Sequence, residues 1–263
     1  MSLILQTSEI LSTFDAVSLP ELEAYMLLDR VDCKYVFPAG WIPEILNTLG
    51  KSYKTLEIET LRVFPYLTTY YDTTDWSFFR QHITERGFRS KVRFRKYEQT
   101  GTSFLEVKNR TNKLRTEKFR IAKHINMSDG LDEESRNFIN HYVYSYNADL
   151  QPVLINRFKR ITLAAKTDME RVTIDFDITF NDTDGKSFSL PDVGIIERKR
   201  VDFSNRSPLS ETLKKMAIYP TGFSKYCLGT SRFYDIPGKS LMKPKLLLIN
   251  KIQNERTSQL HSG

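Results

Sequence analysis

The sequence predicts a mixed α+β fold in which about eight strands can close into a barrel flanked by helices. Two observations support this prediction. Segments with strict alternation of apolar and charged residues recur along the 263-residue chain, which is the pattern of strands with one buried face. The charged face of these segments carries mainly Lys and Arg, with only a few carboxylates. Segments with helical spacing of apolar residues lie before, between and after them.

Alternation predicts the strands, taken in chain order, at 28–37, 65–73, 89–97, 103–110, 117–123, 153–165, 171–180 and 193–201. Apolar residues at helical spacing predict helices at 19–28, 39–52, 131–146 and 207–218. Asp184-Gly185 is a hairpin-type turn signal after the seventh strand. We expect one domain over residues 1–237, and a polar, basic tail or docking segment over 238–263.

The stretch "RSKVRFRKY", residues 89–97, raises the main question. Arg89, Lys91, Arg93 and Arg95 occupy every second position, so a strand would place all four cations on one face. Exposed strand faces usually mix charge signs, because like charges on neighbouring residues repel. The other strands repeat the pattern, with alternate charged positions at Arg30, Asp32 and Lys34; Glu106, Lys108 and Arg110; Lys118 and Arg120; Arg171, Asp175 and Asp177; and Glu197 and Lys199.

Two arrangements of these faces are open. The basic faces can be solvated, or can face nucleic acid, as charged exposed strands often do. Alternatively they line a lumen, which must then be wet, partly open and able to receive a polyanion, because burying so many like charges costs several kcal/mol per ion. Phosphate suits such a lumen, since Arg binds its oxygens bidentately. Glu106, Asp175, Asp177 and Glu197 then relieve repulsion in structural ion pairs or hold a divalent metal.

Composition narrows the possible partners. A formal charge of +7 and a pI near 9.2 favour anions. Cys33 and Cys227 are too few for a disulfide framework or a zinc site, and the four histidines show no ligand spacing. We expect a cytoplasmic protein, because no signal peptide or membrane-spanning apolar run is present. Nucleotide motifs such as the P-loop are also absent.

The ordered fragments "RVDCKYVF", "YYDT", "RSKVRFRKY", "FLEVK", "RFKR" with "RVTID", "IIERK" and "GFSKY" resemble the landmarks of the vacuolar transporter chaperone (VTC) catalytic domain, a polyphosphate polymerase. The resemblance runs from Leu28 to Phe233. This family belongs to the triphosphate tunnel metalloenzymes, related to the CYTH phosphatases. It implies an antiparallel eight-stranded tunnel lined by basic residues.

The resemblance also implies an activity. The tunnel binds the triphosphate of ATP, a divalent metal (manganese or magnesium) assists, and the γ-phosphoryl group passes to a polyphosphate chain that leaves through the tunnel. The implied catalytic residues are Arg93, Arg95, Lys108, Arg160 and Lys225. Substrate contacts are implied for Lys34, Arg30, Lys91, Lys118, Arg120, Arg171, Lys199 and Ser224, and metal binding for Glu197 and Glu106.

Two departures from the family pattern bear on this expectation. The hydrolytic relatives begin with an E-x-E-x-K strand, whereas this chain has Arg30-x-Asp32-x-Lys34, which favours polymerase chemistry over a two-metal hydrolase. Phe158 stands where the family tends to carry a tyrosine, so a hydroxyl contact to phosphate is lost. The alternatives are hydrolysis of tripolyphosphate or nucleoside triphosphates, and noncatalytic binding of polyphosphate. Nucleic-acid binding is the weakest, because aromatic residues are not interleaved with the basic ones in the manner of single-strand binders.

Overall fold

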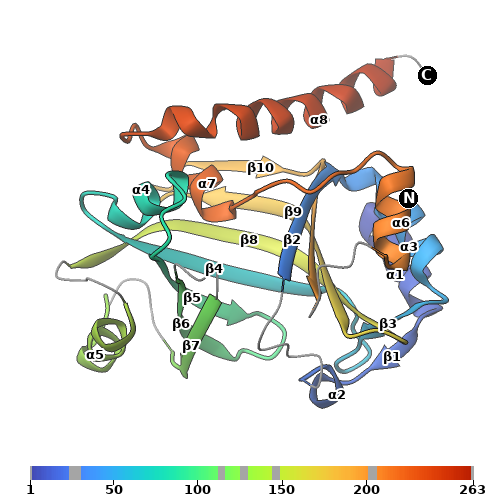
Figure 1. Ribbon diagram of the computed structural model, residues 1–263, viewed down its shortest axis with the longest axis horizontal. Coiled ribbons are helices and arrows are strands. Elements are labelled where there is room, and N and C mark those ends of the chain that lie inside the picture. The colour runs from blue at the N-terminus through green and yellow to red at the C-terminus, as the bar shows by residue number, and fades with distance from the viewer. Residues whose placement is uncertain are drawn as a thin grey trace.

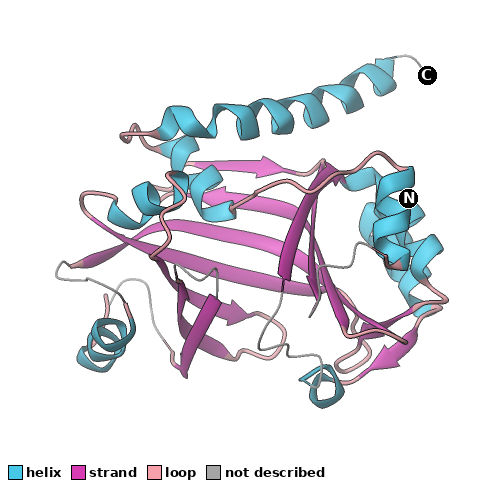
Figure 2. Cartoon of the chain, in the orientation of Figure 1, coloured by secondary structure: helices cyan, strands magenta, loops and turns pink. Residues whose placement is uncertain are grey.

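The computed structural model describes residues 2–23, 31–111, 116–124, 130–143, 149–200 and 206–261, with side chains described as far as residue 254. Figure 1 shows a strongly curved sheet with helices arranged around it, and Figure 2 separates the two kinds of element by colour. The α+β class predicted from the sequence is confirmed.

Eight strands form one continuous path in the sheet, and every neighbouring pair on this path is antiparallel. In spatial order they are β2 (Val31–Pro38), β11 (Val193–Arg200), β9 (Glu170–Asn181), β8 (Leu150–Ala165), β4 (Phe64–Thr73), β5 (Arg89–Tyr97), β6 (Ser103–Arg110) and β7 (Thr116–Ala122). All eight predicted strands are therefore present.

The sheet is curled so far that its two ends approach each other. Lys108 of β6 and Asp32 of β2 lie near opposite ends of the path, yet Lys108 Nζ is 3.9 Å from Asp32 Oδ2. No hydrogen-bonded ladder joins β2 to β7 among the described residues. The sheet thus forms a tunnel wall with a seam, and its concave face is the one that carries Lys108 and Asp32.

Three short strands extend this wall. β3 (Tyr53–Leu56) pairs with β8, β1 (Asp15–Val17) runs parallel to β3, and β10 (Ser187–Leu190) forms a hairpin with β9. Gly185 in the hairpin turn has φ of +87°, a conformation that glycine adopts without strain. The turn predicted at Asp184-Gly185 is confirmed, although β1, β3 and β10 were not predicted.

Helices cover the convex face and one end of the tunnel. They are α1 (Leu3–Ser12), α2 (Leu19–Glu23), α3 (Ile42–Leu49), α4 (Ser77–Ile83), α5 (Glu133–Tyr142), α6 (Pro208–Lys215), α7 (Lys225–Phe233) and α8 (Lys243–His261), with 3₁₀ turns η1 (Ala39–Trp41) and η3 (Lys239–Met242). On the convex face, α3 buries Ile45 and Leu46 in one cluster with Phe176 and Ile196 of the sheet. The four predicted helices correspond to α2, α3, α5 and α6, with residues 24–28 and 144–146 outside the described residues.

The concave face becomes apolar where β2 ends and β11 begins. Val36 and Ile195 are paired in register and lie on the same face as Lys34 and Glu197. They pack with Ile249 and Ile252 of α8, which are 3% and 5% exposed. The C-terminal stretch expected as a tail or docking segment is therefore helical, and it is docked on this end of the tunnel (Figure 1).

Candidate active site

Cations from most strands of the path meet on the concave face. The register places Lys91 opposite Lys108 and Lys108 opposite Lys118, so one row of lysines crosses β5, β6 and β7. Other cations on this face include Lys34, Arg93, Arg95, Arg160, Arg171 and Lys199, and Lys225 of α7 joins them through Asp175. The lumen arrangement predicted from the alternating patterns is the one observed.

Glu106 is surrounded by three of these cations. Its side chain is 1% exposed, Arg93 Nε lies 2.6 Å from Oε2, Arg95 Nη1 lies 4.0 Å from the same oxygen, and Lys118 pairs with Oε1. Burial by itself would raise the pKa of Glu106, but the three cations outweigh burial and hold the pKa well below its ordinary value. The described contacts place Glu106 in structural ion pairs, and its metal role stays a prediction.

Asp175 organises a second cluster. Arg160 donates to it bidentately, from Nε to Oδ1 at 2.5 Å and from Nη2 to Oδ2 at 2.7 Å, and Lys225 also pairs with Oδ2. Burial alone would raise the pKa of Asp175, yet Arg160 and Lys225 lower it to about 2. The Asp175 carboxylate is therefore ionised at neutral pH and fixes both cations in place.

The aromatic ring of Phe158 packs against both cations of this cluster. Lys225 Nζ lies 4.3 Å and the Arg160 guanidinium 5.2 Å from the centre of its ring, which stacks on Tyr66 at 5.3 Å. An aromatic face attracts cations without a hydroxyl group. The residue that departs from the family pattern thus still helps to position two phosphate-binding candidates.

Glu197 belongs to a third cluster near the seam. Lys199 Nζ is 2.8 Å from Oε2 and Lys34 Nζ is 3.8 Å from Oε1. Burial would raise the pKa of Glu197, but Lys199 and Lys34 hold it well below its ordinary value. Asp32 lies on the same face, opposite Lys199. These two carboxylates suit a divalent cation, whose remaining ligands would be phosphate oxygens and water.

Among the described residues, no group of three or more His, Cys, Asp or Glu side chains forms a metal site. Glu197 and Asp32 therefore fit a metal that arrives with phosphate, as magnesium commonly does at nucleotide sites, and not a metal held by protein ligands alone.

The beginning of α7 completes the lumen. Ser224 is the N-cap of this helix and accepts a hydrogen bond from Cys227 N at 3.2 Å, while Lys91 Nζ donates to Ser224 Oγ at 3.1 Å. The free N–H groups and the dipole of a helix N-terminus favour anions. Ser224 and Lys225 thus bring backbone polarity, a hydroxyl group and a charge to one place.

Asp72 anchors α7 and was missed as a functional candidate. It is fully buried and accepts hydrogen bonds from the N–H groups of Phe78 and Phe79 at the start of α4, and from the Tyr226 hydroxyl group. Burial raises the pKa of Asp72. The motif "YYDT" drew attention to this position, but only the fold shows that it holds Tyr226 next to Ser224 and Lys225.

The lysines of the lumen have depressed pKa values. Burial is the largest cause for each, and it brings the pKa of Lys91 to about 7 and those of Lys108, Lys118 and Lys225 to about 8. Neighbouring cations add to this effect, Lys34 for both Lys91 and Lys108. Both causes disfavour the charged form of these lysines, so an anion bound among them would favour their protonation.

Three predicted positions remain to be placed. Arg120 is exposed on the edge strand β7, with its guanidinium 4.9 Å from the centre of the Phe104 ring. Arg171 lies opposite Lys199 on the concave face. Arg30 falls outside the described residues. These positions stay predictions, as do the roles of the others.

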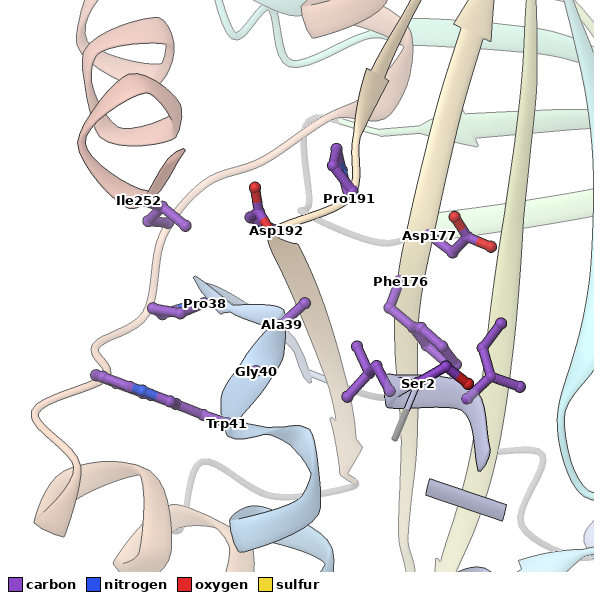
Figure 3. Close-up of a pocket in the computed structure, with 12 residues that line it drawn as sticks. Ser2, Pro38, Ala39, Gly40, Trp41, Phe176, Asp177, Pro191, Asp192 and Ile252 are labelled. Carbon is purple, nitrogen blue, oxygen red and sulfur yellow. The ribbon is translucent and has the colours of Figure 1, made fainter. Parts of the chain in front are cut away.

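Asp177 does not lie where alternation placed it. It has φ of +52°, next to a register shift between β8 and β9, so a bulge interrupts the strand. Its side chain is 49% exposed and pairs with Lys159 at 2.6 Å. Asp177 lies beside Phe176 (Figure 3), and both line a cavity of about 460 Å³ together with residues of η1 and α8. Asp177 was predicted on the face of Asp175, and that prediction was wrong.

The curled antiparallel sheet and its concave face define a cation-lined tunnel as the class of site. Comparison with known families gives a match to the VTC domain over residues 29–234. The chain therefore belongs to the VTC domain family, as its motifs predicted. This membership supports an activity that is related to triphosphate or polyphosphate.

Several solved structures are similar to the chain. A Vibrio parahaemolyticus protein provisionally assigned as an adenylate cyclase has 14% identity and a TM-score of 0.47, covering 76% of this chain and 97% of its own. A Bacillus halodurans protein with the same provisional assignment has 12% identity and a TM-score of 0.46, with coverage of 79% and 98%. A Hippeastrum protein, an adenylyl cyclase candidate with a dominant triphosphatase activity, has 12% identity and a TM-score of 0.46, with coverage of 80% and 99%.

No curated protein matches the chain. Within the described part of the chain, no helix combines the length and the apolar composition needed to cross a bilayer.

Proposed function

We propose that this protein is an ATP-dependent polyphosphate polymerase, which transfers the γ-phosphoryl group of ATP to a polyphosphate chain inside the tunnel. The observation that carries the proposal is the excess of cations over carboxylates on the concave face, organised around Glu106, Asp175 and Glu197. Such a surface complements a chain of phosphates better than a single phosphate.

One buried guanidinium group supports the presence of an anion in the lumen. Arg95 is 7% exposed, and its Nε has no hydrogen-bond partner among the described residues. An unpaired buried donor costs about 1–3 kcal/mol. A phosphate oxygen next to Arg95 and Arg93 would satisfy it.

The transfer needs no protein nucleophile. A terminal phosphate oxygen of the acceptor chain attacks the γ-phosphorus, and the bond from this phosphorus to the β,γ-bridging oxygen breaks, which leaves ADP. Arg93, Arg95, Lys108, Arg160 and Lys225 stabilise the charge on the transferred group and on the leaving oxygen. Glu106 holds Arg93 and Arg95 in position, and Asp175 holds Arg160 and Lys225, so that little reorganisation of these four cations is needed in the transition state.

The remaining candidates bind the phosphates on either side. The contacts described above support this role for Lys34, Lys91, Lys118, Lys199 and Ser224. Arg120, paired in register with Glu106, and Arg171, paired in register with Lys199, are candidates for the same role. Glu197, with Asp32, would hold manganese or magnesium, which would supply charge neutralisation on the bound phosphates.

The direct test is to incubate the purified protein with ATP and manganese and to resolve the products on a gel. We expect chains of increasing length. A Glu197→Ala variant should form none, whereas Arg157→Gln, a change on the convex face of β8, should behave as the unmodified protein does. Free phosphate without chains would instead establish hydrolysis. Tight binding of polyphosphate with intact ATP would establish a binding protein.

A further inference from the structure

Aromatic side chains gather on the concave face where β5 ends and β6 begins. Four rings from four neighbouring strands form a continuous chain of contacts, in the order Phe158 of β8, Tyr66 of β4, Tyr97 of β5 and Phe104 of β6. The ring centres of Tyr66 and Tyr97 are 5.0 Å apart, and Tyr97 meets Phe104 edge to face at 5.9 Å. The curled sheet therefore brings together aromatic residues that are scattered along the sequence.

Guanidinium groups lie over these rings. The guanidinium groups of Arg160 and Arg95 are 5.0 Å and 5.6 Å from the centre of the Tyr66 ring, and that of Arg120 is 4.9 Å from the centre of the Phe104 ring. Aromatic and basic groups thus alternate in space, although they do not alternate along the sequence. This combination binds a base by stacking and the attached phosphates by charge.

Tyr97 and Phe104 are the accessible rings of the chain. Both are partly exposed, whereas Tyr66 and Phe158 are 8% and 4% exposed. Phe104 belongs to none of the three apolar clusters formed by the described residues. Beyond it, the same face of β6 continues with charged residues only, namely Glu106, Lys108 and Arg110. Burial in the core therefore does not account for an aromatic side chain at this position.

The accessible rings lie next to the cations proposed to bind the triphosphate. Phe104 pairs in register with Arg95, and Tyr97 follows Arg95 by two residues, about 7 Å further along β5. Arg160, which is fixed by the Asp175 carboxylate, lies over the same chain of rings. A nucleotide with its phosphates at Arg95 and Arg160 can therefore reach the two accessible rings with its base.

We infer that Tyr97 and Phe104 form a stacking platform for the base of the bound nucleoside triphosphate. The base replaces the exposed Arg120 guanidinium on the face of Phe104, and Arg120 then stacks on the outer face of the base. This inference rests on the proposed function for its ligand and adds base binding to it. The platform distinguishes a nucleoside triphosphate from inorganic tripolyphosphate, which has no ring to stack.

The test compares the binding of ATP and of tripolyphosphate by calorimetry, without divalent metal so that no turnover occurs. The variant Tyr97→Leu/Phe104→Leu removes both rings and keeps apolar side chains at the two positions. Tyr97→Phe keeps the ring and removes only its hydroxyl group. The control Tyr219→Leu removes a ring that is 64% exposed and lies outside this cluster.

We expect the double variant to bind ATP roughly tenfold more weakly and to bind tripolyphosphate within about twofold of the unmodified protein. Tyr97→Phe and Tyr219→Leu should change neither affinity by more than about twofold. A fluorescent analogue, 2-aminopurine riboside triphosphate, reports stacking directly. Its emission should be quenched on binding to the unmodified protein, and less so on binding to the double variant.

Equal losses of affinity for ATP and tripolyphosphate would show that the rings only support the fold of the lumen, and would overturn the platform. An unchanged affinity for ATP, or equal quenching of the analogue by the double variant, would overturn it as well. A loss confined to ATP in a protein that forms no polymer would overturn the polymerase and leave the platform standing. Polymer formation from ATP without a loss confined to ATP would overturn the platform alone.

Discussion

Replacing Glu106 by Gln tests whether this carboxylate is the electrostatic centre of the lumen. The change keeps the shape of the side chain and removes its charge, which leaves Arg93, Arg95 and Lys118 next to one another without their shared partner. Removing one partner of a buried ion pair costs about 3–5 kcal/mol. Since the Lys118 side chain is 36% exposed, water offsets part of this cost, and we expect about 3 kcal/mol. For a chain of this size that corresponds to a thermal midpoint roughly 6–12 °C lower.

The same change should make the protein more dependent on its ligand. Tripolyphosphate can replace the missing negative charge, so it should raise the thermal midpoint of Glu106→Gln by more than that of the unmodified protein. Differential scanning fluorimetry with and without tripolyphosphate, in the absence of metal, measures both effects. The control is Glu134→Gln, because Glu134 is 71% exposed and pairs only at the surface with Lys123; it should stay within about 0.5 kcal/mol of the unmodified protein. An unchanged midpoint for Glu106→Gln, or an equal response to tripolyphosphate, would refute the reasoning.

Three further predictions concern the metal, the lysines and α7. Glu197→Ala should lower turnover with manganese by about a hundredfold or more while metal-free binding of tripolyphosphate, measured by calorimetry, is retained; a parallel loss of both would contradict a metal role. Triphosphate affinity should fall as the pH rises from 7 to 9, because Lys91, with a pKa of about 7 instead of 10.5, loses its charge. Without anion, the free energy of unfolding should rise over the same pH range, because the unfolded chain then binds more protons than the folded chain. A flat profile in either titration would contradict a depressed pKa for Lys91. Tyr226→Phe should cost roughly 1–3 kcal/mol in chemical denaturation and lower kcat more than it raises KM, since Asp72 loses the contact that positions α7; an unaltered kcat would show that this contact is only structural.

Alternation was a reliable guide to the strands because one face of each carries apolar residues of the core and the other carries the charged residues of the lumen. It failed at Asp177, where a single left-handed residue shifts the register between β8 and β9. A bulge of this kind follows from the geometry of neighbouring strands, and an acidic residue in a run of alternating residues gives no sign of it. The short strands β1 and β3 escaped prediction because three or four residues are too few for a period to be recognised.

The helices that were missed depend on tertiary contacts. The start of α4 is capped by Asp72, a residue of strand β4 and not of the helix itself. No periodicity of apolar residues in the sequence indicated α7. The apolar residues of α8 are consecutive near Leu246, so they give no helical pattern. Alternation in the sequence indicated which residues line the lumen, but not how their charges are distributed. The partners of Glu106 could not be predicted, because they depend on which cations the fold brings to it.

The cations of the lumen differ in whether they share a carboxylate, and this difference bears on the proposed polymerase reaction. Cations that share a carboxylate, such as Arg93 with Glu106 and Arg160 with Asp175, are fixed in position, which is what stabilising the charge of a transition state requires. Cations without such a partner attract a chain but do not impose one geometry on it. A phosphate chain that is bound by such cations can therefore shift by one phosphate and exchange equivalent contacts. If every cation of the lumen had a fixed partner, each shift would break well-defined interactions, and movement of the product would become the slow step.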